Sequence, residues 1–388
     1  MWDKKLHKIM AEAGYKTIES SPGYFYNRSE DAECTVYVDD FVLSAHPERD
    51  DKVWAKLSKA IDFKDPPELI NRHLGVYHHI DQPKGAKVTR MIREGKAYLE
   101  AAAKRYCEEI GVQKLEYVES PFIEDKLDEA HLQPGKQAST ASSHLMSLLY
   151  DARLCRGDLI TTTSFLSRRV SKWTLNDDKR LRRLMAYVFH HADLCLNHEL
   201  STDDRSEAVL DYYPDAELGG DYTTTKATGG FWLEVVSPCG TRKWPITWCT
   251  KKAGHSSTAT ADSEVWSLVG AQEVGLKKEV IPLLQQMEVS LNRLVLLRGR
   301  EDNTQCIAAI RKGYSPGLRH LQRHCRLSLG FTNEVFYCDL TDRDAPFYYS
   351  ELVYCESAKQ KGDWMTKELP PIKFKAALEL AGYSKPPE

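Results

Sequence analysis

Four acidic residues in the second half of the chain stand where strands are expected to end or helices to begin. Asp215 ends an expected strand, and Asp302 lies at the junction between another expected strand and the helix that follows it. Glu264 falls in the first turn of a long expected helix, and Asp363 opens the last one. If such acids converge at one edge of a sheet, they repel one another unless hard cations lie between them. Mg²⁺ prefers oxygen ligands, and two such ions about 4 Å apart can hydrolyse a phosphodiester.

An alternative applies to each of these acids taken alone. An acidic side chain at the start of a helix caps the free backbone N–H groups and is favoured by the helix dipole. Spacing does not decide between an N-cap and a metal ligand for Asp302 or Asp363.

A second acidic feature interrupts the apolar run 34–43 at its middle, as Tyr37-Val38-Asp39-Asp40. This pattern predicts a β-hairpin with both carboxylates at its tip. Adjacent acids inside an apolar hairpin cost stability unless they bind a cation or protrude into solvent. Asp-Asp is also ordinary turn chemistry, which remains the alternative.

The elements that must position these acids predict a mixed α/β protein. In the first half, helices are expected at 2–13, 92–110, 143–154 and within 158–196, around the hairpin. The second half has three expected strands in series (208–213, 230–236 and 246–250), a long helix at 261–287, and then strands 294–297 and 352–355 alternating with helices. This order predicts one mixed five-stranded sheet flanked by helices, with a domain boundary close to residue 203.

Composition sets the class of protein. The 388 residues are 42% hydrophobic and 28% charged, as expected for a globular chain of two or three domains. Apolar runs are too short to span a bilayer, and the first residues lack the apolar core of a signal peptide. The ten cysteines are scattered singly. We therefore expect reduced thiols in an intracellular protein, without a membrane partner.

The net charge of −3 conceals three basic stretches, at 84–105, 168–183 and 311–326. A chain that is nearly neutral overall can still bind a phosphate backbone through its local field. The alternative is that each stretch is a solvated helix face. The predicted nucleic-acid contacts are Lys84, Lys87, Arg90, Arg93, Arg168, Arg169, Arg182 and Arg183.

The segment 35–43 resembles the catalytic turn of reverse transcriptases from copia-type LTR retrotransposons, and the likeness continues through the chain. The matching segments follow in order: Trp2 to Gly14, Leu74-Gly75-Val76, Glu119-Ser120-Pro121, Arg156-Gly157-Asp158-Leu159-Ile160, Tyr213-Pro214-Asp215, Trp248-Cys249-Thr250-Lys251-Lys252, Ser263-Glu264-Val265-Trp266, Asp302-Asn303 and Gly362-Asp363-Trp364-Met365-Thr366-Lys367. Gly157 stands where this family has proline. The ordered set is more specific than any one of its motifs.

This resemblance implies an RNase H domain in which Asp215, Glu264, Asp302 and Asp363 bind Mg²⁺ or Mn²⁺. The implied activity is cleavage of RNA in an RNA–DNA hybrid. His320, within a segment similar to the family's Lys-His-Ile, would assist proton transfer or product release. The alternative is that His320 faces phosphate or solvent.

The resemblance also implies a polymerase site, with Asp39 and Asp40 as ligands and Tyr37 beside them. Polymerisation needs a third carboxylate upstream and finger elements, and about 36 residues precede the turn. We therefore expect an incomplete polymerase site. The predicted parts are a reverse-transcriptase palm remnant at 1–85, thumb and connection helices at 86–203, and an RNase H-like domain at 204–388.

The sequence thus predicts a retroelement fragment that cleaves RNA in hybrids. Expected partners are the hybrid, an RNA template, a DNA primer and other Pol or Gag products, in a cytoplasmic particle or the nucleus. The alternative is a catalytically inactive or co-opted fragment that only binds nucleic acid.

Overall fold

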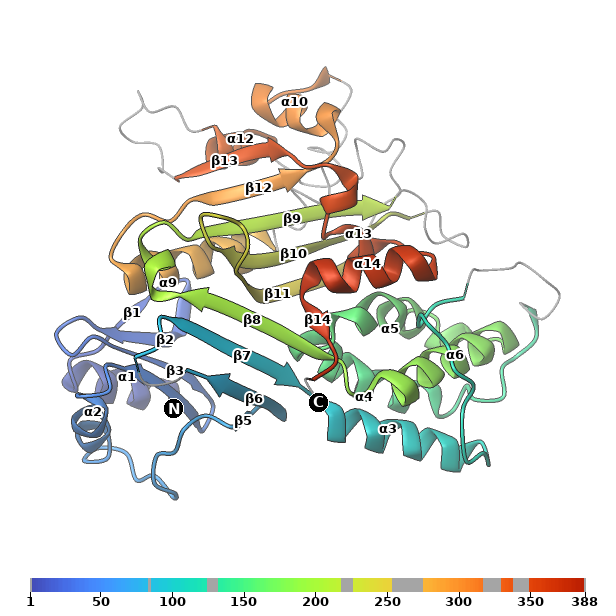
Figure 1. The fold of residues 1–388 in the computed structure, drawn as a ribbon, viewed down its shortest axis with the longest axis horizontal. Helices are drawn as coiled ribbons and strands as arrows, with labels where there is room; N and C mark the ends of the chain where they lie inside the picture. Colours follow the sequence, from blue (N-terminus) through green and yellow to red (C-terminus); the bar gives the residue numbers. More distant parts are fainter. Residues whose placement is uncertain are drawn as a thin grey trace. The chain divides into compact units, whose positions relative to one another are not determined.

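The structure is a computed structural model that describes residues 2–82, 85–123, 132–217, 226–252, 275–316, 329–337 and 349–386. It confirms the mixed α/β class, with helices and several sheets (Figure 1). The chain forms two compact units: Met1–Asn71 with Lys277–Val295, and Arg72–Leu276 with Leu296–Glu388. The functional division at residues 85 and 203 stays a prediction. In the part of the chain that the structure describes, no helix is long and apolar enough to cross a membrane.

The first unit is an antiparallel sheet, in the order β1-β2-β3-β4, with helices packed on it. Helix α1 buries Leu6, Ile9 and Met10, whose helical spacing places them on one face. Leu6 and Met10 share a core with Phe25 and Cys34 of the sheet. The elements are α1 (Trp2–Glu12), β1 (Lys16–Ile18), β2 (Ser21–Asn27), β3 (Ala32–Tyr37), β4 (Asp40–Ala45), α2 (Asp50–Leu57) and α9 (Ile281–Leu291).

Two sheets form the second unit, and the first of them is antiparallel, in the order β14-β8-β7-β6-β5. Its strands are β5 (Arg72–His73), β6 (Val76–Asp81), β7 (Val88–Glu94), β8 (Cys195–Ser201) and β14 (Tyr383–Ser384). The predictions of helix at 92–94 and at 195–196 are therefore wrong. These residues instead belong to strands: Arg93 pairs with Leu196 across β7 and β8, Glu94 pairs with Tyr77 of β6, and Cys195 pairs with Ser384 of β14.

The other sheet is mixed and has the order β11-β10-β9-β12-β13. Strand β9 pairs antiparallel with β10, and β12 runs parallel to both β9 and β13. Its strands are β9 (Val209–Glu217), β10 (Thr228–Val236), β11 (Lys243–Lys252), β12 (Leu297–Glu301) and β13 (Ser350–Tyr354). Strand β12 lies later than predicted: Leu294 is exposed, and the charged Arg298 and Arg300 belong to the strand because both pair with Asp211.

Helices cover these sheets, and their bounds complete the second unit: α3 (Lys96–Glu109), α4 (Ala141–Leu154), α5 (Ile160–Ser167), α6 (Leu175–His191), α10 (Thr304–Lys312), α12 (Leu329–Phe336), α13 (Asp363–Thr366) and α14 (Pro371–Ala381). Three indole rings form the centre of the core, because Trp232 stacks on Trp248 at 5.0 Å and contacts Trp364 at 5.4 Å. Helix α13 is thereby anchored over β9 and β10. Of the predicted helix 261–287, residues 261–274 lie outside the described part.

Candidate metal centre

Strand β9 carries acids at alternate positions. Asp211, Asp215 and Glu217 share one face of the sheet because side chains alternate along a strand. Asp215 is fully buried. Glycines make room beside it: a Cβ on Gly362 would lie 2.7 Å from the Asp215 Cβ, and a Cβ on Gly230 would lie 2.8 Å from the Met365 Cβ. Local sequence therefore allows α13 to approach β9 closely.

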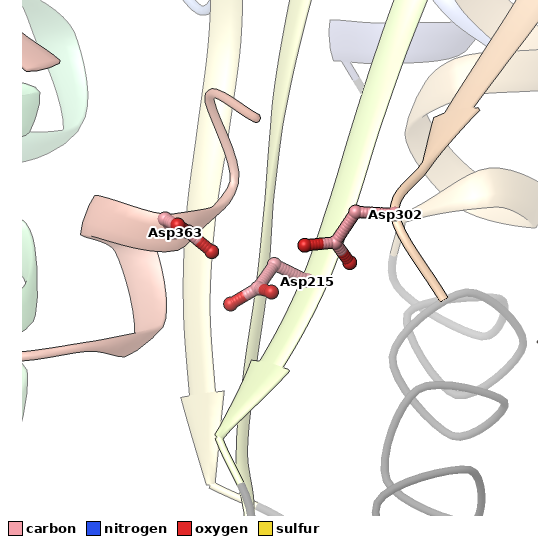
Figure 2. Close-up of side chains that lie close together, drawn as sticks. All are labelled: Asp215, Asp302 and Asp363. Carbon is pink, nitrogen blue, oxygen red and sulfur yellow. The ribbon is translucent and has the colours of Figure 1, made fainter. Parts of the chain in front are cut away.

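Three of the predicted acids meet at this point. Asp302 directly follows β12, which lies beside β9, and Asp363 opens α13. One ligand oxygen from each of Asp215, Asp302 and Asp363 lies within 4.8 Å of the others. Figure 2 shows Asp215 between the other two, with the carboxylates turned toward one another. Strand ends and a helix start thus converge at one edge of the sheet.

Two residues that the sequence reasoning did not select complete the site. Lys367 donates to Asp215 Oδ1 at 3.0 Å and to Asp363 Oδ1 at 2.6 Å. The Thr366 hydroxyl donates to Asp215 Oδ2. Both follow Asp363 in the segment Gly362-Asp363-Trp364-Met365-Thr366-Lys367, and the i, i+4 spacing of Asp363 and Lys367 was the available signal.

The environment favours the protonated forms of nearby acids. Burial, assisted by the charge of Asp215, raises the pKa of Asp363 to about 6, against the attraction of Lys367. Burial likewise raises the pKa of Glu217 to about 6. Glu301 is wholly buried beside Asp302, so its pKa is raised well above the usual range. Although burial lowers the pKa of Lys367, the two carboxylates raise it overall.

This donor set fits a hard divalent cation. Three carboxylates offer oxygen ligands within a span that one ion can bridge, and Mg²⁺ commonly takes few protein carboxylates and keeps several waters. The Lys367 ammonium already lies against two of these carboxylates, so the site accepts positive charge. Asp302 is positioned from the other side by the Ser357 hydroxyl, which donates to its Oδ2 at 2.9 Å.

Two predicted residues of the site, Glu264 and His320, lie outside the described residues, as does Lys84 among the predicted cations. The predicted roles of Glu264 and His320 at the metal centre therefore stay predictions.

The other acidic pair lies at the tip of the β3–β4 hairpin, as predicted. Asp39 and Asp40 are exposed, and Tyr37 pairs with Asp40 across the turn. Val38 has a φ of 57°, a costly conformation for a β-branched residue. Within the described residues, no third acid, histidine or cysteine joins Asp39 and Asp40 at metal-binding distance.

Three of the predicted nucleic-acid contacts form ion pairs within the chain, and of these Lys87 and Arg90 are exposed while Arg182 is half-buried. Lys87 contacts Asp203 at 3.0 Å, and Arg90 contacts Glu199 at 2.8 Å. Arg182 forms two hydrogen bonds with Glu116, at 3.2 and 3.0 Å. Exposed pairs of this kind contribute little to stability, so a phosphate can compete for these cations.

The remaining four are less accessible. Arg93 donates to His198 Nε2 and to the Leu154 and Pro245 carbonyls. Arg169 contacts the buried Asp177 at 2.5 Å. Arg183 donates to the Ser120 carbonyl, and Arg168 donates to the Thr228 hydroxyl at 3.3 Å. Arg93 and Arg169 therefore hold the fold together in this structure.

Comparison with known proteins adds no relative: no protein family matches the chain, and no curated protein resembles it closely enough to indicate a relationship.

Proposed function

We propose that the chain is a metal-dependent phosphodiesterase whose site is the triad Asp215, Asp302 and Asp363. The observation that supports this is the convergence of three carboxylate oxygens within 4.8 Å, from three separate elements. Like charges held so close are costly unless cations neutralise them. A divalent ion bound there would lower the pKa of a water molecule and polarise the phosphate.

The residues of the chain would divide the work as follows. Asp215, held by Lys367 and Thr366, would be the central ligand. Asp302 and Asp363 would complete the ligand set from its two sides. In the reaction, the oxygen of a water molecule forms a bond to phosphorus, the bond from phosphorus to the leaving oxygen breaks, and that oxygen takes up a proton.

The proposed substrate is the RNA strand of an RNA–DNA hybrid. It is supported by the resemblance to copia-type elements, whose matching segments include all three acids of the triad. Enzymes that act on hybrids recognise the shape of the groove and the 2′-hydroxyls rather than the sequence. Polymerase activity is not part of the proposal, because Asp39 and Asp40 lack a third ligand among the described residues.

A second candidate is a nucleic-acid-binding protein without catalysis. The contact of Lys367 with two of the three acids favours it, because a lysine can neutralise these carboxylates permanently. The two candidates differ in whether a divalent ion binds to the triad.

The test is cleavage of labelled substrates by the full chain in the presence of Mg²⁺ or Mn²⁺. We expect cuts in the RNA strand of a hybrid and none in duplex DNA. Asp215→Asn should abolish cleavage, whereas Asp81→Asn, at the exposed end of β6, should retain it. If the wild-type chain binds the hybrid without cutting it at any metal concentration, the second candidate is correct.

A further inference from the structure

A charged cavity of about 340 Å³ opens on the second unit, in a region that the triad does not use. Strands of the mixed sheet and the segment after β13 contribute its walls. The charged side chains that line it are Asp211, Glu234, Lys243, Arg300, Glu356, Lys359 and Lys361. Four of these seven are cations, one from each of β11 and β12 and two from the segment leading to α13.

The acids in this cavity are already neutralised by other groups. Asp211 forms ion pairs with Arg298 at 2.7 Å and with Arg300 at 3.1 Å. Glu234 is fully buried, and both of its carboxylate oxygens accept hydrogen bonds from the Lys361 ammonium at 2.6 Å. The Trp232 indole N–H donates to the same carboxylate at 3.0 Å. The third acid, Glu356, is exposed and forms an ion pair with Lys359 at 2.9 Å. Each of the three carboxylates therefore has a cationic partner, and none repels an incoming anion in full.

Lys243 differs from the other cations of the cavity. It begins β11, is half-buried, and forms no ion pair with a carboxylate among the described residues. Its ammonium is close enough to Lys361 for the two to repel each other. Lys361 is itself only 3% exposed. Two ammonium groups that face one cavity, with Arg300 beside them, create a positive field that a small anion would relieve.

We propose that this cavity binds a phosphate group, and that it holds a backbone phosphate of the nucleic acid cut at the triad. Lys243, Arg300 and Lys361 would donate to its oxygens. Lysine and arginine both suit phosphate, arginine through its planar fork and lysine as a point charge. The second half of this inference rests on the proposed function, whereas the anion site itself does not.

The register of the sheet connects the cavity to the triad. Arg298 pairs with Asp211, so Arg298 and Arg300 lie on the same face of the sheet as Asp211. Asp302 comes directly after β12 and continues this alternation. Arg300 lies two residues before Asp302, which is about 7 Å along a strand. Lys361 likewise lies two residues before Asp363. The axial rise of about 3.4 Å per nucleotide is shorter than the path between consecutive phosphates on the outside of the helix, so a phosphate in the cavity would be one or two nucleotides from the one at the triad.

The first experiment measures binding of inorganic phosphate to the full chain by isothermal titration calorimetry. Lys243→Met is the variant of choice, because removing Lys361 would strand the buried Glu234 charge and unfold the protein. We expect one phosphate per wild-type chain and at least a tenfold loss of affinity in Lys243→Met. Lys312→Met, which removes an exposed lysine of α10 outside the cavity, is the control and should bind as the wild type does. No phosphate binding by the wild type, or equal affinities in the two variants, would overturn the proposal.

The second experiment separates a backbone phosphate from free phosphate. With the hybrid as substrate, Lys243→Met should raise KM several-fold and leave kcat at saturation near the wild-type value. If phosphate affinity falls while KM stays unchanged, the cavity serves a free anion and its assignment to the backbone is wrong. If phosphate binds as expected but the wild type never cuts the hybrid, the proposed function fails and the anion site stands.

Discussion

Gly362 is the position where a single methyl group should separate the triad. Its φ of −71° is one that alanine adopts freely, so Gly362→Ala changes packing and not backbone preference. The added Cβ would lie 2.7 Å from the Asp215 Cβ and 2.8 Å from the Tyr213 carbonyl oxygen. Ordinary contact begins at 3.4 Å, so α13 and β9 must separate by several tenths of an ångström.

Two consequences of different size follow from this separation. Overpacking of a close contact costs about 1–3 kcal/mol in the free energy of unfolding. Metal sites tolerate misplacement of only about 0.5 Å, and Asp363 directly follows the substituted residue. We expect affinity for Mn²⁺ to fall at least tenfold, or about 1.4 kcal/mol.

The assay pairs urea denaturation with Mn²⁺ binding followed by electron paramagnetic resonance. Gly111→Ala is the matched control, because Gly111 has a φ of 70° and open space around it. That variant should lose about 1–2 kcal/mol of stability through the left-handed backbone and keep its Mn²⁺ affinity. If Gly362→Ala binds Mn²⁺ as tightly as the control does, close approach of α13 to β9 does not set the geometry of the triad.

Three further predictions concern single side chains. Lys367→Met should tighten Mn²⁺ binding about tenfold, because the Lys367 ammonium competes with the metal ion for the carboxylates of Asp215 and Asp363. Weaker Mn²⁺ binding by this variant in titrations would refute the competition. Burial raises the pKa of Asp151 to about 6, so its carboxyl group stabilises the native state below pH 4, and this stabilisation is lost as the pH rises through 6. Asp151→Asn should therefore stabilise the fold by about 1–3 kcal/mol at pH 8 and by less at pH 5, measured by urea denaturation. Equal gains at the two pH values would contradict this. Arg169→Ala should cost about 1.5–3 kcal/mol through the lost contact with buried Asp177, and unchanged stability with weakened hybrid binding would mean that Arg169 contacts the duplex.

The acids of the triad could be singled out from sequence because each was expected at the end of a strand or the start of a helix, whereas their role as one set of metal ligands came from the resemblance. Asp302 directly follows β12, Asp363 opens α13, and Asp215 lies two residues before the end of β9, and the structure brings the three together. Lys367 was not predicted, because its contact with Asp215 depends on how α13 packs against β9, 152 residues earlier in the chain. Local pattern carries no information about such a contact.

The basic stretches depend on distant parts of the chain in the same way, and their role in nucleic-acid binding stays a prediction. A run of arginines predicts a surface for phosphate, but acids from distant segments can pair with the same groups. Arg182 pairs with Glu116, 66 residues away, and Arg169 with Asp177 in the next helix. The missed strand β8 has a similar cause, since Cys195–Ser201 becomes a strand only by pairing with β7.

The most direct test of the account is anomalous diffraction from a crystal of the full chain soaked in Mn²⁺. We expect a peak bonded to carboxylate oxygens of Asp215 and Asp302, close to Asp363. A well-occupied Mn²⁺ elsewhere, with no peak among these three acids, would contradict the claim that the triad is a metal centre.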